Sequence, residues 1–171
     1  VTHQYLEWMG ESGLAQWSVE RIASEQVAIQ NQLLHLGTSL ELISTAQQRV
    51  TDALGFVLQD ERGQWILKDH AQAKSEWAWS AVNEEGQIKT YIVDRTFVDE
   101  TGTRWVIDYK TGLHQGSDLE SYLDEKQKEH GEQLANYAKI FRAIEDRPIS
   151  MGLYFPFENG WCQWGFTEPE L

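Results

Sequence analysis

The segment from residue 91 to residue 112 holds two apolar runs, and each run ends on an acidic residue. A short run closes at Asp94, and the longer run over residues 105–107 closes at Asp108. Runs of consecutive apolar residues are typical of strands that are buried on both faces. The sequence between them, residues 99–102, contains the glycine that hairpin turns favour. The segment therefore predicts two paired strands inside a sheet.

The polar residues at the ends of these runs form a candidate metal site. Lys110 stands two residues beyond Asp108, so both side chains point to the same face, and strand pairing brings Asp94 beside them. Two carboxylates suffice to hold Mg²⁺ while leaving room for a phosphate oxygen. A metal ion acidifies a bound water molecule. Lys110 then either orients or deprotonates that water or stabilises the negative transition state.

A bland interpretation exists for the same residues. The sequence Asp-x-Lys at a strand end is more often a solvated surface feature than a site. Acidic residues at the ends of doubly buried strands are costly, however, unless they are used. The placement of Asp94 and Asp108 therefore favours the metal site.

A helix is predicted downstream of the paired strands. Over residues 132–141 the apolar residues recur at helical spacing, so one side of this segment faces a core. Gln133 and Tyr137 are four residues apart and share one face of the helix.

Together these residues resemble the RecB-type nuclease domain of the PD-(D/E)xK superfamily, found at the C-terminus of the UvrD-like helicase-nucleases RecB and AddA. That family carries an Asp after one strand, an Asp-x-Lys after the next and a Gln-x-x-x-Tyr on the following helix. Here these fall on Asp94, on Asp108 with Lys110, and on Gln133 with Tyr137. Val93 stands where the superfamily name has Pro, which the RecB branch tolerates.

The resemblance implies the fold class and the domain organisation. We expect an α/β, restriction-endonuclease-like core with a central mixed β-sheet flanked by helices and an N-terminal helical segment. Residues 1–171 would form a single nuclease domain, with residues 1–60 helical and residues 61–171 carrying the catalytic core. Because the first motif lies at His3, we expect a domain excised from a larger helicase-nuclease.

The resemblance also implies metal ligands and a function. His3 would bind the metal ion, Mg²⁺ or Mn²⁺, with Asp94, Asp108 and the backbone carbonyl of Tyr109. The implied activity is a metal-dependent DNA exonuclease in an ATP-dependent helicase-nuclease of double-strand-break repair. Expected partners are DNA, attached helicase domains and a partner subunit, without a membrane, in the bacterial cytoplasm.

Two alternatives stay open. The chain could be a catalytically silent member of the superfamily that serves as a docking or DNA-guiding module. It could also be a metal-dependent phosphoesterase for a small substrate, which the match at Gln133 and Tyr137 makes less favourable.

Two further residues are candidates near the site. Glu76 opens the first predicted strand of the sheet, where it either reaches the site or is a solvated strand end. Arg95 either pairs with a site carboxylate, contacts phosphate or forms an exposed ion pair. The remaining histidines show no metal-ligand spacing and are predicted to lie on the surface: His35, His70, His114 and His130.

The composition limits the class of protein. The chain has 171 residues, 41% of them hydrophobic, which is ample for one domain. Its single cysteine, Cys162, excludes an internal disulfide and is predicted to be a buried, inert thiol in a reducing compartment. A net charge of −13 argues against DNA binding by general electrostatic attraction to the phosphates, so we expect this chain alone to bind DNA weakly.

The N-terminal third is predicted to be mainly helical. The apolar spacing indicates helices over residues 1–10 and 19–36, and Ser39 is placed to cap a third helix that reaches Leu54. Residues 60–63 predict a turn that leads into a brief strand over residues 65–67.

The remainder predicts the sheet and its connections. Residues 76–82 form the first strand and residues 83–86 its hairpin turn. The polar sequence after Lys110 predicts a mobile loop that runs to a helix start near residues 123–126. Residues 149–157 and 160–166 predict two strands around an asparagine-glycine turn.

Overall fold

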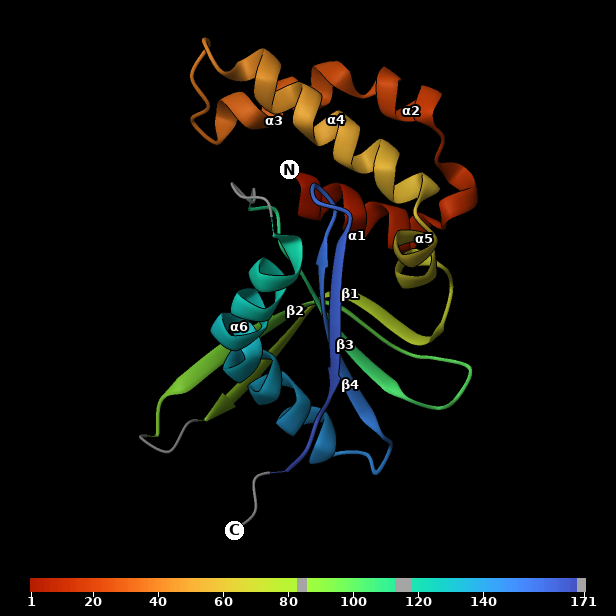
Figure 1. The fold of residues 1–171 in the computed structure, drawn as a ribbon, viewed down its shortest axis with the longest axis vertical. Coiled ribbons are helices and arrows are strands. Elements are labelled where there is room, and N and C mark those ends of the chain that lie inside the picture. The colour runs from red at the N-terminus through yellow and green to blue at the C-terminus, as the bar shows by residue number, and fades with distance from the viewer. Residues whose placement is uncertain (83–85, 113–117, 169–171) are drawn as a thin grey trace. The chain divides into compact units, whose positions relative to one another are not determined.

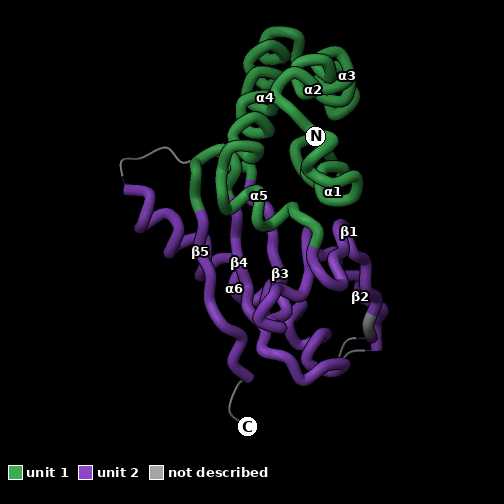
Figure 2. Tube along the Cα trace, turned by 90° about the vertical axis from the view of Figure 1, so that its right-hand side faces the viewer, with its two compact units in different colours: residues 1–69, 111–113, 155–160 green, residues 70–110, 114–154, 161–171 purple. Residues whose placement is uncertain are grey.

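The computed structural model of the chain describes residues 1–82, 86–112 and 118–168. Two compact units divide the chain, and Figure 2 shows them in different colours. Unit 1 comprises residues 1–69, 111–113 and 155–160, and unit 2 comprises residues 70–110, 114–154 and 161–171.

Unit 1 is built from helices. They are α1 (Thr2–Ser12), the short 3₁₀ helix η1 (Leu14–Gln16), α2 (Val19–Ser24), α3 (Gln26–His35), α4 (Ile43–Gln59) and α5 (Glu61–Leu67). Its core contains fully buried apolar side chains from several helices, such as Leu6, Ile29 and Leu54. None of the helices in the described part of the chain is long and apolar enough to cross a membrane.

Three predictions for unit 1 are wrong in detail. Residues 19–36 form two helices, α2 and α3, instead of one. Glu25 separates them, because its backbone, with ψ 0, is not helical. Ser39 does not cap α4, whose first turn follows Leu42.

The strand predicted over residues 65–67 is a helix. Asp60 lies at the N-cap of α5, and its Oδ2 accepts a hydrogen bond from the amide of Gly63 at 2.8 Å. An N-cap carboxylate satisfies an amide that would otherwise lack a partner, so the expected turn starts a helix. Ile66 and Leu67 are then buried as helical residues.

The five-stranded sheet lies almost entirely in unit 2. Its strands are β1 (Ala71–Val82), β2 (Ile88–Val98), β3 (Arg104–Tyr109), β4 (Ile149–Phe155) and β5 (Gly160–Gly165), in the order β1-β2-β3-β4-β5. β1, β2 and β3 are antiparallel neighbours, whereas β3 and β4 are parallel. Parallel neighbours need a long crossover, which is the helix α6 (Leu119–Arg142). Figure 1 shows α6 lying across one face of the sheet. The predicted α/β class with a mixed sheet and N-terminal helices is confirmed.

The burial of the strands differs between β2 and β3. All six residues of β3 are buried, as the apolar run predicted. β2 does not end at Asp94 but continues to Val98, so Asp94 lies inside the strand. Ile92 is 48% exposed, and the expectation of two buried faces is wrong for that part of β2.

α6 begins earlier than predicted. Asp118 is its N-cap, and the carboxylate accepts hydrogen bonds from the amide and the hydroxyl of Ser121. This cap starts the helix at Leu119, so the predicted loop is wrong for residues 119–126. Residues 83–85 of the predicted turn and residues 113–117 of the predicted loop, which include His114, lie outside the described residues. Asn159 adopts φ +50 in the turn before β5, as the asparagine-glycine sequence predicted.

Candidate active site

Asp94 and Asp108 lie on neighbouring strands at the same level of the sheet. The register of β2 and β3 pairs Arg95 with Ile107 and Thr96 with Val106, which places Asp94 opposite Asp108. Asp94 Oδ2 accepts a hydrogen bond of 2.6 Å from the amide of Tyr109. This bond to the main chain of β3 fixes the Asp94 carboxylate beside the strand that carries Asp108.

Lys110 completes a charged pair with Asp108. Lys110 Nζ lies 2.7 Å from Asp108 Oδ2, and the two side chains are 20% and 8% exposed. The amide of Lys110 donates to the carbonyl of Tyr154 on β4 at 2.8 Å. The lysine is therefore held by β4 where it leaves β3, with its ammonium directed at the buried carboxylate.

Glu76 adds a third carboxylate to this row. β1 and β2 pair Ser75 with Arg95 and Trp77 with Val93, so Glu76 lies opposite Asp94 in the register. The backbone of Glu76 has φ +44, a left-handed conformation that is strained for any residue with a Cβ. Such strain concentrates at functional sites. Glu76, Asp94 and Asp108 thus follow one another across β1, β2 and β3.

Arg95 is a buried cation of the same region. It is 1% exposed, and Nη1 donates to Ser75 Oγ at 3.0 Å. This burial places Arg95 out of reach of a phosphate and removes the exposed ion pair that the sequence left open. The surroundings of the Tyr109 phenol shift its pKa. Burial raises this pKa, and the charge of Arg95 lowers it. The negative charges of Asp94, Glu76 and Asp108 raise it further.

Gln133 and Tyr137 lie on the side of α6 that packs against β2 at Tyr91. Gln133 Nε2 donates a hydrogen bond of 2.8 Å to Tyr137 Oη. The Tyr137 ring packs edge-on against the ring of Tyr91, with 5.9 Å between the ring centres. Burial raises the pKa of Tyr137, the hydrogen bond from Gln133 lowers it, and the charges of Asp108 and Asp94 raise it.

His130 is a neighbour of Lys110 that sequence reasoning missed. The sequence predicted a surface histidine, but the side chain is 20% exposed. Burial and the charge of Lys110 both lower its pKa. The available signal was its position three residues before Gln133, on the same face of the predicted helix.

His3 belongs to unit 1, whereas the carboxylates belong to unit 2. It lies in α1 and is half-buried. Within unit 1 it lines a cavity of about 270 Å³ together with residues such as Leu36 and Arg49.

The donors of unit 2 fit a hard divalent cation that keeps most of its water. Among the described residues, no three His, Cys, Asp or Glu side chains are arranged to hold a metal ion. Mg²⁺, however, is often held by one or two carboxylates and completes its octahedron with water and substrate oxygens. Asp94 and Asp108 supply that number of carboxylates, and the carbonyl of Tyr109 is the further oxygen that the family resemblance implies.

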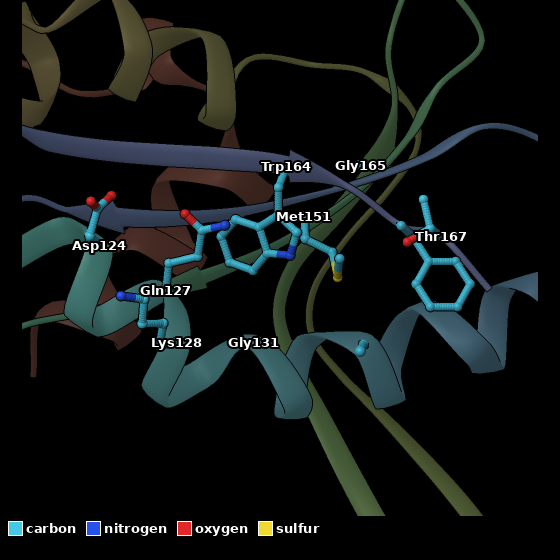
Figure 3. A pocket seen from close by; sticks show the side chains of 10 residues that line it. Asp124, Gln127, Lys128, Gly131, Met151, Trp164, Gly165 and Thr167 are labelled. Atoms are coloured by element: carbon cyan, nitrogen blue, oxygen red, sulfur yellow. The ribbon is translucent and has the colours of Figure 1, made fainter. Parts of the chain in front are cut away.

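A separate cavity of about 520 Å³ lies between α6 and β5 (Figure 3). Its lining includes Lys128 and Gly131 of α6 and Trp164 of β5. At 100° per residue, Lys128 and Gly131 lie on the side of α6 opposite to Gln133 and Tyr137. This cavity is therefore distinct from the carboxylate row.

Comparison with known proteins identifies the family. One solved structure, the crystal structure of SSO0001, matches 96% of this chain and 76% of its own length, with 16% identity and a TM-score of 0.39. No curated protein matches the chain. The family model of the PD-(D/E)XK nuclease superfamily matches residues 2–161. The chain therefore belongs to the PD-(D/E)XK nuclease superfamily.

Proposed function

We propose that this chain is a metal-dependent deoxyribonuclease domain that hydrolyses phosphodiester bonds of DNA. The observation that carries the proposal is the placement of Asp94 opposite Asp108, with the Lys110 ammonium 2.7 Å from Asp108. The superfamily supports a nucleic acid as the substrate. Placing the buried carboxylate of Asp108 opposite the half-buried carboxylate of Asp94 is costly, and cation binding offsets that cost.

Within unit 2, Asp94 and Asp108 would hold Mg²⁺ or Mn²⁺, with the Tyr109 carbonyl as a further proposed ligand. When bound, the ion acidifies a water molecule and neutralises charge on the phosphate. Asp108 positions Lys110, whose ammonium stabilises the charge that develops on the phosphoryl oxygens. Gln133 orients the Tyr137 phenol, whose pKa the charges of Asp108 and Asp94 raise, and this phenol would support the position of the substrate.

The Gln133 and Tyr137 pair supports a RecB-type role for the domain. We propose exonuclease activity within an ATP-dependent helicase-nuclease of double-strand-break repair. Attached helicase domains, with or without a partner subunit, would deliver DNA to a chain whose own net charge is −13.

A catalytically silent docking or DNA-guiding module is the second candidate. The acidic composition favours it, because a nuclease that relied on its own electrostatics would carry clustered Lys and Arg. The complete set of Asp94, Asp108 and Lys110 favours catalysis, since a silent module has no use for a buried lysine-carboxylate pair.

The test compares wild type with Lys110→Ala on linear single- and double-stranded DNA in Mg²⁺ or Mn²⁺. Lys139→Ala, an exposed lysine on α6, is the matched control. We expect wild type and Lys139→Ala to degrade DNA alike, and Lys110→Ala to lose activity by about 100-fold or more. Intact DNA with wild type would favour the docking module, and equal cleavage by Lys110→Ala would refute the proposed site.

A further inference from the structure

An exposed apolar surface covers one side of α3 and the connection from α3 to α4. Of ten exposed large apolar side chains in the described part of the chain, five lie between residues 27 and 42. Leu36, Leu40 and Leu42 are 61–79% exposed, and the other two are Val27 and Leu34. These five side chains define the apolar patch, which belongs entirely to unit 1.

The backbone of the patch is ordered by hydrogen bonds. α3 ends in a Schellman motif at Gly37, which adopts φ +88. The amide of Gly37 donates to the carbonyl of Leu34, and the amide of Thr38 donates to the carbonyl of Leu33, each at 3.0 Å. Residues 39–42 form a second hydrogen-bonded turn. The leucines of the connection are therefore exposed in a defined conformation.

The patch continues from the connection onto α3. Val27 and Leu34 are seven residues apart, so they share one side of the helix. The side that packs into the core of unit 1 is a different one, because it carries the buried residues Ile29 and Leu33. Val27 and Leu34 thus form an apolar stripe outside the core, and this stripe leads directly to Leu36.

The segment that carries the patch is almost uncharged. Residues 26–48 contain one formally charged residue, Glu41, although 24% of the whole chain is charged and its net charge is −13. A basic partner would find its counterparts among the acidic residues elsewhere in the chain, but not here. The surface that complements this patch is therefore apolar and uncharged as well.

We propose that the apolar patch is the contact between two copies of this chain, related by a two-fold axis. In such a dimer the same surface of each copy meets its equivalent, so the leucines are buried against leucines. Two chains of net charge −13 repel each other, and this uncharged segment is where a second copy approaches with little repulsion. Exposed apolar patches commonly mark protein interaction sites. The dimer is independent of the proposed nuclease activity.

The charge of the chain gives the dimer a distinctive dependence on salt. Salt screens the repulsion between two acidic chains, whereas it does not weaken an apolar contact. We therefore expect the Kd of the dimer to fall as the ionic strength rises. A dimer whose Kd rises with ionic strength would be held by ion pairs between the copies, and the patch would not be its contact.

Sedimentation equilibrium over a range of protein concentrations measures the dimer directly. Wild type is expected to approach twice the mass of the chain. Combining Leu36→Lys with Leu40→Lys should raise the Kd about 100-fold or more, because each substitution places a charge in the contact. Ile144→Lys, at an exposed isoleucine of unit 2, is the matched control and should dimerise like wild type. Wild type with the mass of one chain at every concentration, or a lysine variant that dimerises undiminished, would overturn the proposal.

Cross-linking locates the contact without a disruptive substitution. Leu40→Cys and Ile144→Cys are each made in a Cys162→Ser background, because Cys162 is the single cysteine of the chain. Both proteins are then treated with a short bismaleimide. We expect a covalent dimer from Leu40→Cys and none from Ile144→Cys. Equal cross-linking at both positions, or a dimer in solution that does not cross-link at residue 40, would place the contact elsewhere and refute the patch.

Discussion

Glu145 shows how single charges stabilise unit 2. Its carboxylate accepts hydrogen bonds from Arg104 Nε at 2.6 Å and from Arg104 Nη2 at 3.1 Å. The Glu145 side chain is 15% exposed and that of Arg104 is 5% exposed. Arg147 Nε adds a third contact at 3.2 Å. The hydrogen bonds from Arg104 hold the pKa of Glu145 below 4.5, against the opposing effect of burial. The hydrogen bonds from Arg104 outweigh the effect of burial, so the carboxylate of Glu145 is favoured in its ionised form.

Glu145→Gln is therefore expected to lower stability in a pH-dependent way. Because the folded-state pKa is depressed, the contribution is complete above the unfolded value of 4.5 and is lost as the pH falls through the folded value. We expect a loss of about 2 kcal/mol at pH 7 that shrinks toward pH 3. Urea denaturation of wild type, Glu145→Gln and the exposed control Glu132→Gln measures it. An equal loss at both pH values would contradict the assignment.

The proximity of Asp94, Asp108 and Lys110 could be predicted from the sequence, but their surroundings could not. Asp94, Asp108 and Lys110 follow apolar runs whose pattern predicts neighbouring strands. The position of Glu76 opposite Asp94 depends on the register of β1, and the burial of Arg95 depends on what covers β2. Neither quantity is local in sequence, so the alternatives for Arg95 stayed open until the strands were paired.

Among the helices, the errors of prediction for α5 and α6 have a common cause. α5 and α6 each have an aspartate at the N-cap, Asp60 and Asp118. The carboxylate of each accepts a hydrogen bond from a backbone amide of the first turn. Both lie in polar sequence that also suits a turn or loop, because Asp caps helices and initiates turns by the same hydrogen bond. The strands and long helices were predictable because their apolar spacing extends over many residues.

Gly152 shows how closely β4 and β5 pack. A Cβ at this position would overlap the indole of Trp161, whose ring lies over the glycine. Gly131 in α6 is a matched contrast, since a Cβ there meets nothing within 4 Å and the backbone is helical.

Gly152→Ala is expected to destabilise the protein by about 1–3 kcal/mol through overpacking. Gly131→Ala is expected to stabilise it by about 0.5–1 kcal/mol, because alanine loses less backbone entropy in a helix. Thermal and urea unfolding of both variants test this contrast. Trp161→Ala removes the obstructing ring, so Gly152→Ala should cost less in that background. Equal effects of the two glycine substitutions would show that Trp161 does not restrict β4.

For the chain as a whole, the net charge of −13 and a nucleic-acid function have to be reconciled. The carboxylates that supply part of this charge are the proposed ligands of a divalent cation, which inverts the local potential. The proposed metal site predicts that the chain cleaves nucleic acid only when a metal ion is present.

The proposed activity is tested most directly by cleavage of an end-labelled single-stranded oligonucleotide. Wild type is assayed in Mn²⁺ and in EDTA, beside Asp108→Asn in Mn²⁺, with folding of both proteins checked by circular dichroism. We expect cleavage by wild type in Mn²⁺ and its loss, by about 100-fold or more, in EDTA and in Asp108→Asn. Cleavage that persists in EDTA, or an Asp108→Asn variant as active as wild type, would contradict a metal-dependent site at Asp94 and Asp108.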